Sequence, residues 1–138
     1  MADLKATAKR FYDEVFGDGD IDVIDELLTD DFVDHEELPG FGNDRDGAKA
    51  FMAMLRDAFP DLEAPVDDMI AEGNKVVVRA RLTGTHKGEF LGIPATGKSV
   101  DVPMIDIIEF SGDKAAAHWG ITDMGALMEQ LGISEMPG

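Results

Sequence analysis

The spacing of apolar residues divides the chain into a helix-forming first part and a strand-forming second part. In the first part apolar residues recur at three- and four-residue intervals, as Leu4, Ala8, Phe11 and Val15 do, which is the period of an amphipathic helix. After Pro60 the period falls to two, which is typical of strands with one buried face. The expected elements are helices over residues 3–16, 20–28 and 47–59, a short extended segment over 31–35, strands over 65–72, 75–86, 100–110 and 114–122, and a last helix that starts near residue 123 and ends at Gly132.

Turn-forming residues join the four strands in the manner of a meander. Gly73-Asn74 separates the first two as in a tight hairpin, and Ser111-Gly112-Asp113 separates the last two. Helices followed by antiparallel strands and one more helix predict an α+β fold. We expect a curved antiparallel sheet, wrapped by the N-terminal helices into a cone with an internal cavity, and a short C-terminal helix. Residues 1–138 are expected to form a single domain.

The amino-acid composition limits the kinds of site and the cellular location that we expect. The chain has no cysteine, which excludes disulfides, Cys-based metal sites and a cysteine nucleophile. The first residues lack the apolar core of a signal peptide, and no run approaches the length of a membrane span. We therefore expect a cytoplasmic protein with no membrane partner.

The chain is strongly acidic, with 29 acidic residues against 12 basic ones and a net charge of −17. Such a surface repels nucleic acid and anionic lipid, so neither is expected as a partner. Two interpretations of the charge remain open: an ordinary acidic protein, or one adapted to high salt, where screening removes self-repulsion. The scarcity of lysine and abundance of aspartate favour the second.

Asp106 is the most informative candidate residue. By strand alternation it shares a face with Val102, Met104 and Ile108, where an unpaired carboxylate is costly. Burial is one way in which a carboxylate becomes a useful acid or base near neutral pH. Alternatively, this face is less buried than the pattern indicates, or Asp106 is held by an arginine of the neighbouring strand or by a backbone N–H.

His86 and His118, at or near strand ends, are the natural catalytic partners of Asp106, although each also fits a purely structural role. The substrate-binding candidates are His35, Phe90, Met104, Trp119 and Asp123. Among them, Asp123 has an alternative role as the N-cap of the last helix, and Met104 an alternative role as core filler.

Metal and nucleotide signatures are lacking. The three histidines fit no compact metal-binding spacing such as H-E-x-x-H, so no metal is expected. The sequence has no G-x-G-x-x-G, P-loop or G-x-S-x-G motif, which argues against a nucleotide and against a hydrolase-elbow serine. We expect no cofactor.

Several segments match a known family, and together they cover nearly the whole chain. They are Asp31-Phe32-Val33-Asp34-His35, Gly47-Ala48, Gly84-Thr85-His86-Lys87-Gly88-Glu89-Phe90-Leu91-Gly92-Ile93-Pro94-Ala95-Thr96-Gly97, His118-Trp119 and Leu131-Gly132. This set resembles the SnoaL-like polyketide (ester) cyclases. The resemblance implies the α+β cone also seen in nuclear transport factor two, scytalone dehydratase and ketosteroid isomerase. It also implies a homodimer or higher homo-oligomer, and ring closure by aldol condensation without metal or organic cofactor.

The chain departs from the family pattern at one important position. In the cyclases the base is an aspartate two residues after the strand histidine, where this chain has Gly120. Asp106 occupies the position of a second polar pocket residue, a histidine in the cyclases. Either the carboxylate has moved to the neighbouring strand or it has been lost.

The leading hypothesis is a cofactor-free enzyme that acts on a hydrophobic carbonyl compound by acid–base chemistry. Asp106 would be the general base, and His118 and His86 would orient it or polarise a carbonyl. The reaction would be proton abstraction next to a carbonyl, as in a cyclase or isomerase, or water activation as in a hydrolase. A second hypothesis is a non-catalytic protein that sequesters an apolar ligand in the cone. A third is a structural or dimerisation module that uses the outer face of the sheet.

Overall fold

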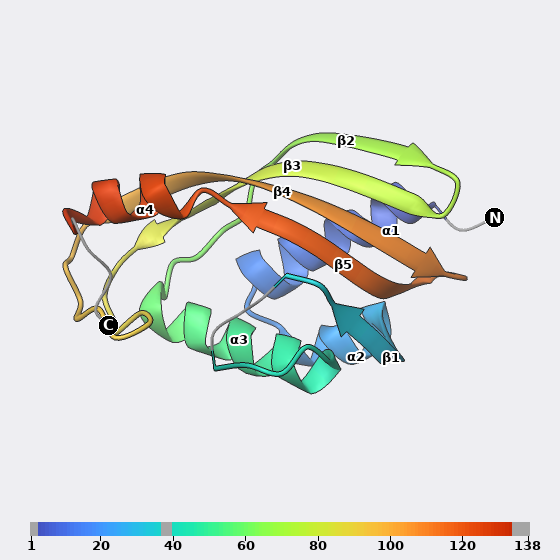
Figure 1. Cartoon of the computed structure of the whole chain (residues 1–138), viewed down its shortest axis with the longest axis horizontal. Helices are drawn as coiled ribbons and strands as arrows, with labels where there is room; N and C mark the ends of the chain where they lie inside the picture. The colour runs from blue at the N-terminus through green and yellow to red at the C-terminus, as the bar shows by residue number, and fades with distance from the viewer. Residues whose placement is uncertain (1–2, 37–39, 134–138) are drawn as a thin grey trace.

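The computed structural model describes residues 3–36 and 40–133, and it has the expected α+β architecture. A curved sheet forms one layer, and the N-terminal helices and α3 cover its concave side (Figure 1). The helical segments are α1 (Leu4–Arg10), its π-helical continuation η1 (Phe11–Gly17), η2 (Ile21–Val23), α2 (Ile24–Leu27), α3 (Arg45–Ala58) and α4 (Met124–Leu131). The strands are β1 (Leu28–Asp34), β2 (Val66–Glu72), β3 (Lys75–Thr85), β4 (Ser99–Ser111) and β5 (Lys114–Thr122).

The five strands have the order β1-β5-β4-β3-β2. The meander from β2 to β5 is antiparallel, as the turn residues predict. The first strand differs, because β1 pairs with β5 in parallel and makes the sheet mixed. The sequence pattern indicated only a short extended segment at 31–35, since a seven-residue edge strand with two buried positions carries little pairing information.

The second predicted helix is shorter than expected. The segment 20–28 divides into a single 3₁₀ turn and a four-residue helix, and Leu28 already belongs to β1. The first helix also changes character, because its second half has π-helical hydrogen bonding, which often occurs at functional sites. None of the helices within residues 3–36 and 40–133 is long and apolar enough to cross a membrane.

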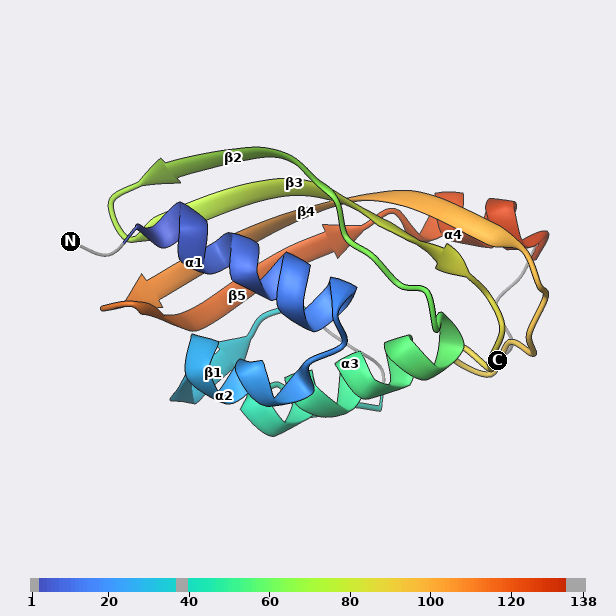
Figure 2. The same ribbon diagram turned by 180° about the vertical axis from the view of Figure 1, so that it is seen from behind.

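The hydrophobic core lies between the concave face of the sheet and the helices. Along β4 the residues alternate between exposed and buried, so that Val102, Met104, Asp106 and Ile108 all point inward. Seen from behind, α1 and its continuation run across the sheet while α3 closes the lower side (Figure 2). Burial of apolar surface in this layer is the main force that holds the helices on the sheet.

Candidate active site

A cavity of about 350 Å³ opens between the concave face of the sheet and the helices. This volume lies in the range of small-molecule sites. The lining is mostly apolar and comes from helices and strands on all sides, and includes Ala8, Phe11, Phe16, Leu27, Phe32, Phe51, Met52, Leu55, Leu82, Phe90, Leu91, Met104, Ile108, Phe110 and Leu127. The cavity therefore suits a hydrophobic ligand.

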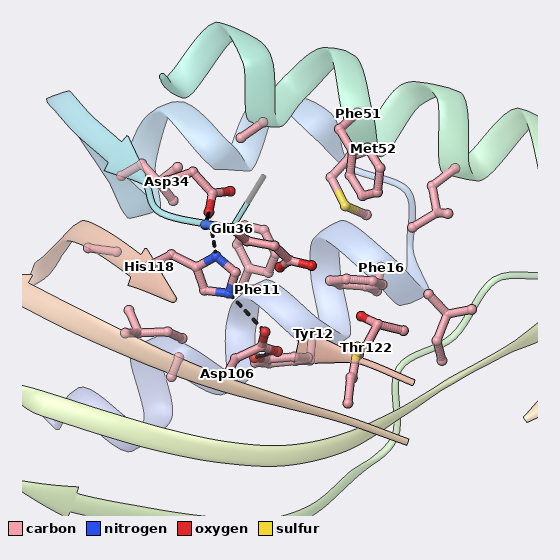
Figure 3. A pocket seen from close by; sticks show the side chains of 18 of the residues that line it. Phe11, Tyr12, Phe16, Asp34, Glu36, Phe51, Met52, Asp106, His118 and Thr122 are labelled. Carbon is pink, nitrogen blue, oxygen red and sulfur yellow. Dashed lines mark hydrogen bonds and ion pairs between the residues drawn. The ribbon is translucent and has the colours of Figure 1, made fainter. Parts of the chain in front are cut away.

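One group of hydrogen-bonded polar side chains lies on the cavity wall (Figure 3). His118 Nδ1 lies 2.9 Å from Asp34 Oδ1, and His118 Nε2 lies 2.8 Å from Asp106 Oδ1. The Tyr12 hydroxyl donates to the second oxygen, Asp106 Oδ2, at 2.6 Å. Tyr12, Asp106, His118 and Asp34 thus form a continuous chain of hydrogen bonds, which we call the Tyr12–Asp34 network.

Strand register explains why these side chains meet. Asp34 and His118 are direct partners in the parallel β1–β5 pair. Asp106 on β4 is the direct partner of Gly120 on β5, two residues beyond His118. Asp106 and His118 are therefore diagonal neighbours on one face of the sheet, within reach of long side chains. Tyr12 approaches from the π-helical segment on the opposite wall.

The absence of a side chain at Gly120 makes room for the network. A Cβ added to Gly120 would collide with Asp106 Oδ1, and would lie 2.6 Å from Glu36 Oε1 and 2.8 Å from His118 Cε1. Because real Cβ atoms do not approach other atoms this closely, only glycine fits between these three side chains as they stand.

His118 carries a positive charge at neutral pH. Its burial alone would lower its pKa, but the hydrogen bonds to Asp106 and Asp34 and the charges of both carboxylates raise the pKa to about 10. Both ring nitrogens then donate, one to each carboxylate. The imidazolium orients Asp106 and balances its charge, and it is not available as a base near pH 7.

Tyr12, within the network, and Glu36, beside it, also have raised pKa values. Burial, together with the charge of Asp106, raises the pKa of Tyr12 well above its usual value, so its hydroxyl remains a donor. Burial also raises the pKa of Glu36, and the nearby Asp106 and Asp34 carboxylates raise it further, while the charge of His118 opposes the shift. Glu36 lines the same cavity (Figure 3).

The structure brings together some of the residues singled out in the sequence. Asp106, only 8% exposed, and His118 share a hydrogen bond in the cavity. Phe90 and Met104 line the cavity. The arginine alternative for Asp106 does not apply, because Arg79 pairs with Asp67, and Arg81 with Asp67 and Asp101, on the outer face.

His86 does not join this group. It is fully buried at the end of β3, where its ring packs against Phe59 and its Nδ1 lies 3.0 Å from Thr96 Oγ1. Burial lowers the pKa of His86, which keeps the ring neutral. Its backbone also bonds to Gly97 and Lys98, so it fastens the connection between β3 and β4.

Three other candidates lie outside the cavity lining. The rings of His35 and Trp119 stack on each other, with centroids 4.6 Å apart and planes 5° from parallel. Asp123 is the N-cap of α4, where its carboxylate accepts a hydrogen bond from the Ala126 N–H.

Sequence reasoning did not assign Tyr12, Asp34 or Glu36 to the site. Tyr12 fits the apolar stripe of its helix, so nothing in the spacing marks its hydroxyl as functional. Asp34 ends β1 and Glu36 follows it, and the sequence did not indicate the parallel pairing of this strand. The available signal was local: four ionisable residues in a row, Asp34-His35-Glu36-Glu37, at the end of an extended segment.

A metal ion has one conceivable location within the described residues. Ligand atoms of Asp34, Glu36 and His118 lie within 4.8 Å of one another. Both nitrogens of His118 are already engaged by Asp34 and Asp106, so a metal would have to break the network. The donor set is better explained as a hydrogen-bonded charge network, and the absence of a metal remains a prediction.

Comparisons with protein-family models and with solved structures point to the same family. The family model for SnoaL-like polyketide cyclase matches residues 6–131. A SnoaL-like protein from Jannaschia sp. CCS1 is 36% identical, with 93% of this chain and 90% of that chain covered and a TM-score of 0.81. IdmH from Streptomyces antibioticus, a candidate polyketide cyclase, is 30% identical, with 96% and 100% covered and a TM-score of 0.82. AclR from Streptomyces galilaeus, a candidate hydroxylase, is 28% identical, with 99% and 86% covered and a TM-score of 0.83. None of the curated proteins matches.

Proposed function

The chain belongs to the SnoaL-like polyketide cyclase family, and on this premise we propose that it is a cofactor-free enzyme that removes a proton next to the carbonyl of a hydrophobic compound. The enolate formed in this step would then close a ring, as in a cyclase, or be protonated elsewhere, as in an isomerase. Fold alone does not decide this, since structural neighbours include both a candidate cyclase and a candidate hydroxylase.

The observation that carries the proposal is the Tyr12–Asp34 network on the wall of an otherwise apolar cavity. Polar groups are costly to bury, and here they converge at one place where a ligand carbonyl can reach them. Groups with shifted pKa values in a small-molecule cavity are typical of sites for proton transfer.

The geometry favours a division of roles that differs from the sequence hypothesis. That hypothesis gave Asp106 the role of base, but both Asp106 oxygens accept hydrogen bonds, from His118 and from Tyr12. We propose that Tyr12 donates to the substrate oxygen, and that Asp106 and His118 position its hydroxyl. The Tyr12 hydroxyl rotates from Asp106 to donate to the developing enolate oxygen, and the His118 imidazolium, which lies between Asp106 and Asp34, offsets part of the negative charge at this place. His86, outside the cavity lining, supports the fold near the cavity.

The alternative, a non-catalytic binding protein, has the same cavity but leaves its bound ligand chemically unchanged. The distinguishing experiment uses 2-tetralone, a small hydrophobic ketone with acidic C–H bonds, incubated in D₂O with the protein and a chelator. Proton NMR follows the loss of the C1 hydrogens. Catalysed exchange above the buffer rate supports the enzyme, whereas bound ketone recovered with its hydrogens exchanging at the buffer rate favours a binding protein.

The outer face of the sheet is the surface we propose for self-association. Ile105 and Ile121 are direct partners across β4 and β5, and they are 51% and 77% exposed. Ile107, opposite Trp119, extends this apolar area. Contiguous exposed apolar residues of this kind mark interaction sites more often than free surface. A second copy of the chain is the occupant that the family resemblance implies.

A further inference from the structure

Glu36 lies just beyond β1 and enters the same cavity as the Tyr12–Asp34 network. Its backbone N–H donates to Asp34 Oδ1 at 2.9 Å, which fixes the chain direction at this point. Its Oε1 lies 2.6 Å from the position that a Cβ at Gly120 would take. The space of the missing side chain on β5 is thus partly filled by a carboxylate from the segment after β1.

The hydrogen bonding of Glu36 contrasts with that of its acidic neighbours. Asp34 and Asp106 each accept hydrogen bonds from His118. Within residues 3–36 and 40–133, the Glu36 carboxylate accepts none, and it faces the cavity next to them (Figure 3). A carboxylate with free lone pairs in a partly desolvated site is better placed to take a proton than one held by two donors.

From this arrangement we propose that Glu36 is the general base, the catalytic residue that takes the proton from the substrate carbon. The proposal rests on the function proposed above and names the proton acceptor of that reaction. Tyr12, positioned by Asp106, then donates to the substrate oxygen, while Glu36 acts on the neighbouring carbon.

The step balances without any further reactant. The C–H bond next to the carbonyl breaks, its proton passes to a Glu36 carboxylate oxygen, and its electron pair forms the enolate double bond. The carbonyl π electrons move to the oxygen beside Tyr12. In an isomerisation the protonated Glu36 returns the proton to another carbon, and in a ring closure it protonates the new alkoxide.

The charges around Glu36 suit this role. Asp34 comes from β1, Asp106 from β4, His118 from β5 and neutral Tyr12 from the helical wall. Burial and the two aspartates raise the pKa of Glu36, and His118 limits the rise. A carboxylate whose pKa is shifted toward neutral pH in this way is a stronger base when ionised and a usable acid once protonated.

The test compares Glu36→Gln with Asp31→Asn in the 2-tetralone exchange assay. Asp31 is an exposed aspartate on β1, so its variant makes the same carboxylate-to-amide change away from the cavity. We expect Glu36→Gln to lose roughly 10²–10⁴-fold in exchange rate, the usual contribution of a general base. Asp31→Asn should exchange like the wild type, whose rate should rise with pH as Glu36 ionises.

Two further measurements separate a catalytic role from a structural one. Glu36→Gln should still bind 2-naphthol, an aromatic analogue of the enol. If the variant loses both this binding and exchange, Glu36 maintains the shape of the cavity and does not take the proton. Glu36→Ala should recover exchange when acetate is added, because acetate replaces the missing base.

Exchange at the wild-type rate in Glu36→Gln would overturn the assignment and leave the proposed function intact. Failure of the wild type itself to exchange 2-tetralone would overturn the proposed function, and the role of Glu36 with it.

Discussion

Asp106 and Gly120 are direct partners across β4 and β5, and the carboxylate of one fills the space where the other has no side chain. The cyclases that the sequence resembles carry an aspartate at the position of Gly120. Here two carboxylates, Asp106 from the adjacent strand and Glu36 from the end of β1, approach the same point. This arrangement fits the hypothesis that the carboxylate has moved to another part of the site, which stays a prediction.

A methyl group at position 120 should disrupt this centre. Gly120→Ala forces Asp106, Glu36 or His118 to move, so we expect 2-tetralone exchange to fall at least tenfold. Overpacking should also lower the free energy of unfolding by about 1–3 kcal/mol, measured by urea denaturation. Gly125→Ala in α4 is the control, because its added Cβ meets nothing closer than 3.5 Å. Wild-type exchange by Gly120→Ala would mean that the crowded centre is not the reaction site.

Asp106→Asn should impair the oxygen side of the reaction. Loss of the charge removes a strong acceptor for Tyr12 and one partner of the His118 imidazolium. We expect a loss of roughly 10²–10³-fold in exchange, because Tyr12, the donor to the substrate oxygen, loses the partner that positions it. Binding of 2-naphthol should weaken as well, in contrast to Glu36→Gln. Asp113→Asn, in the turn after β4, controls for the change of charge. Tight 2-naphthol binding by Asp106→Asn would contradict the proposed role.

The raised pKa of His118 makes stability depend on pH in a defined window. Its folded pKa of about 10 exceeds the ordinary value of 6.5, so the folded state binds this proton more tightly than the unfolded state. The stabilisation is present below about pH 6.5 and is lost as pH rises through about 10. Urea denaturation should therefore give a falling free energy of unfolding across this range, with a shallower fall in His118→Gln. His35 is exposed, so His35→Gln is the control and should show the same dependence of unfolding free energy on pH as the wild type. An equal dependence in His118→Gln and the wild type would refute the ion pair.

If the acidic surface is an adaptation to high salt, the protein should keep gaining stability at salt concentrations above those at which screening is complete. The net charge of −17 produces self-repulsion, and simple screening is nearly complete at ~0.1–0.2 M salt. We expect the melting temperature, followed by circular dichroism in KCl, to keep rising above 1 M. A plateau near 0.2 M would identify an ordinary acidic protein.

A charge on the outer sheet face should prevent self-association. Ile121→Lys places an ammonium group at the most exposed isoleucine of this face without touching the cavity. We expect the wild type to sediment as a dimer or larger oligomer and the variant as a monomer in analytical ultracentrifugation. Ile70→Lys, on the more distant strand β2, serves as the comparison. A monomeric wild type would exclude this use of the surface.

The sequence predicted the fold well because its signals are local and periodic. Alternation along β4 identified the inward face and placed Asp106 on it. The parallel pairing of β1 was not predictable in this way, because it joins residues far apart in the chain that share no turn.

For the same reason the sequence indicated Asp106 and His118 but not Asp34, Glu36 or Tyr12. Each of these three reaches the site through tertiary packing of a segment whose own pattern is ordinary. His86 illustrates the opposite case, since the sequence marked it as a catalytic candidate near a strand end and the structure buries it outside the cavity lining.

The most direct test of the account is a crystal structure of the protein with 2-naphthol bound. The account predicts the naphthol inside the cone, with its oxygen within about 3.2 Å of the Tyr12 hydroxyl or Asp106 and its C1 carbon facing Glu36. A naphthol bound outside the cone, or inside it with its oxygen turned away from this group, would contradict the proposed reaction.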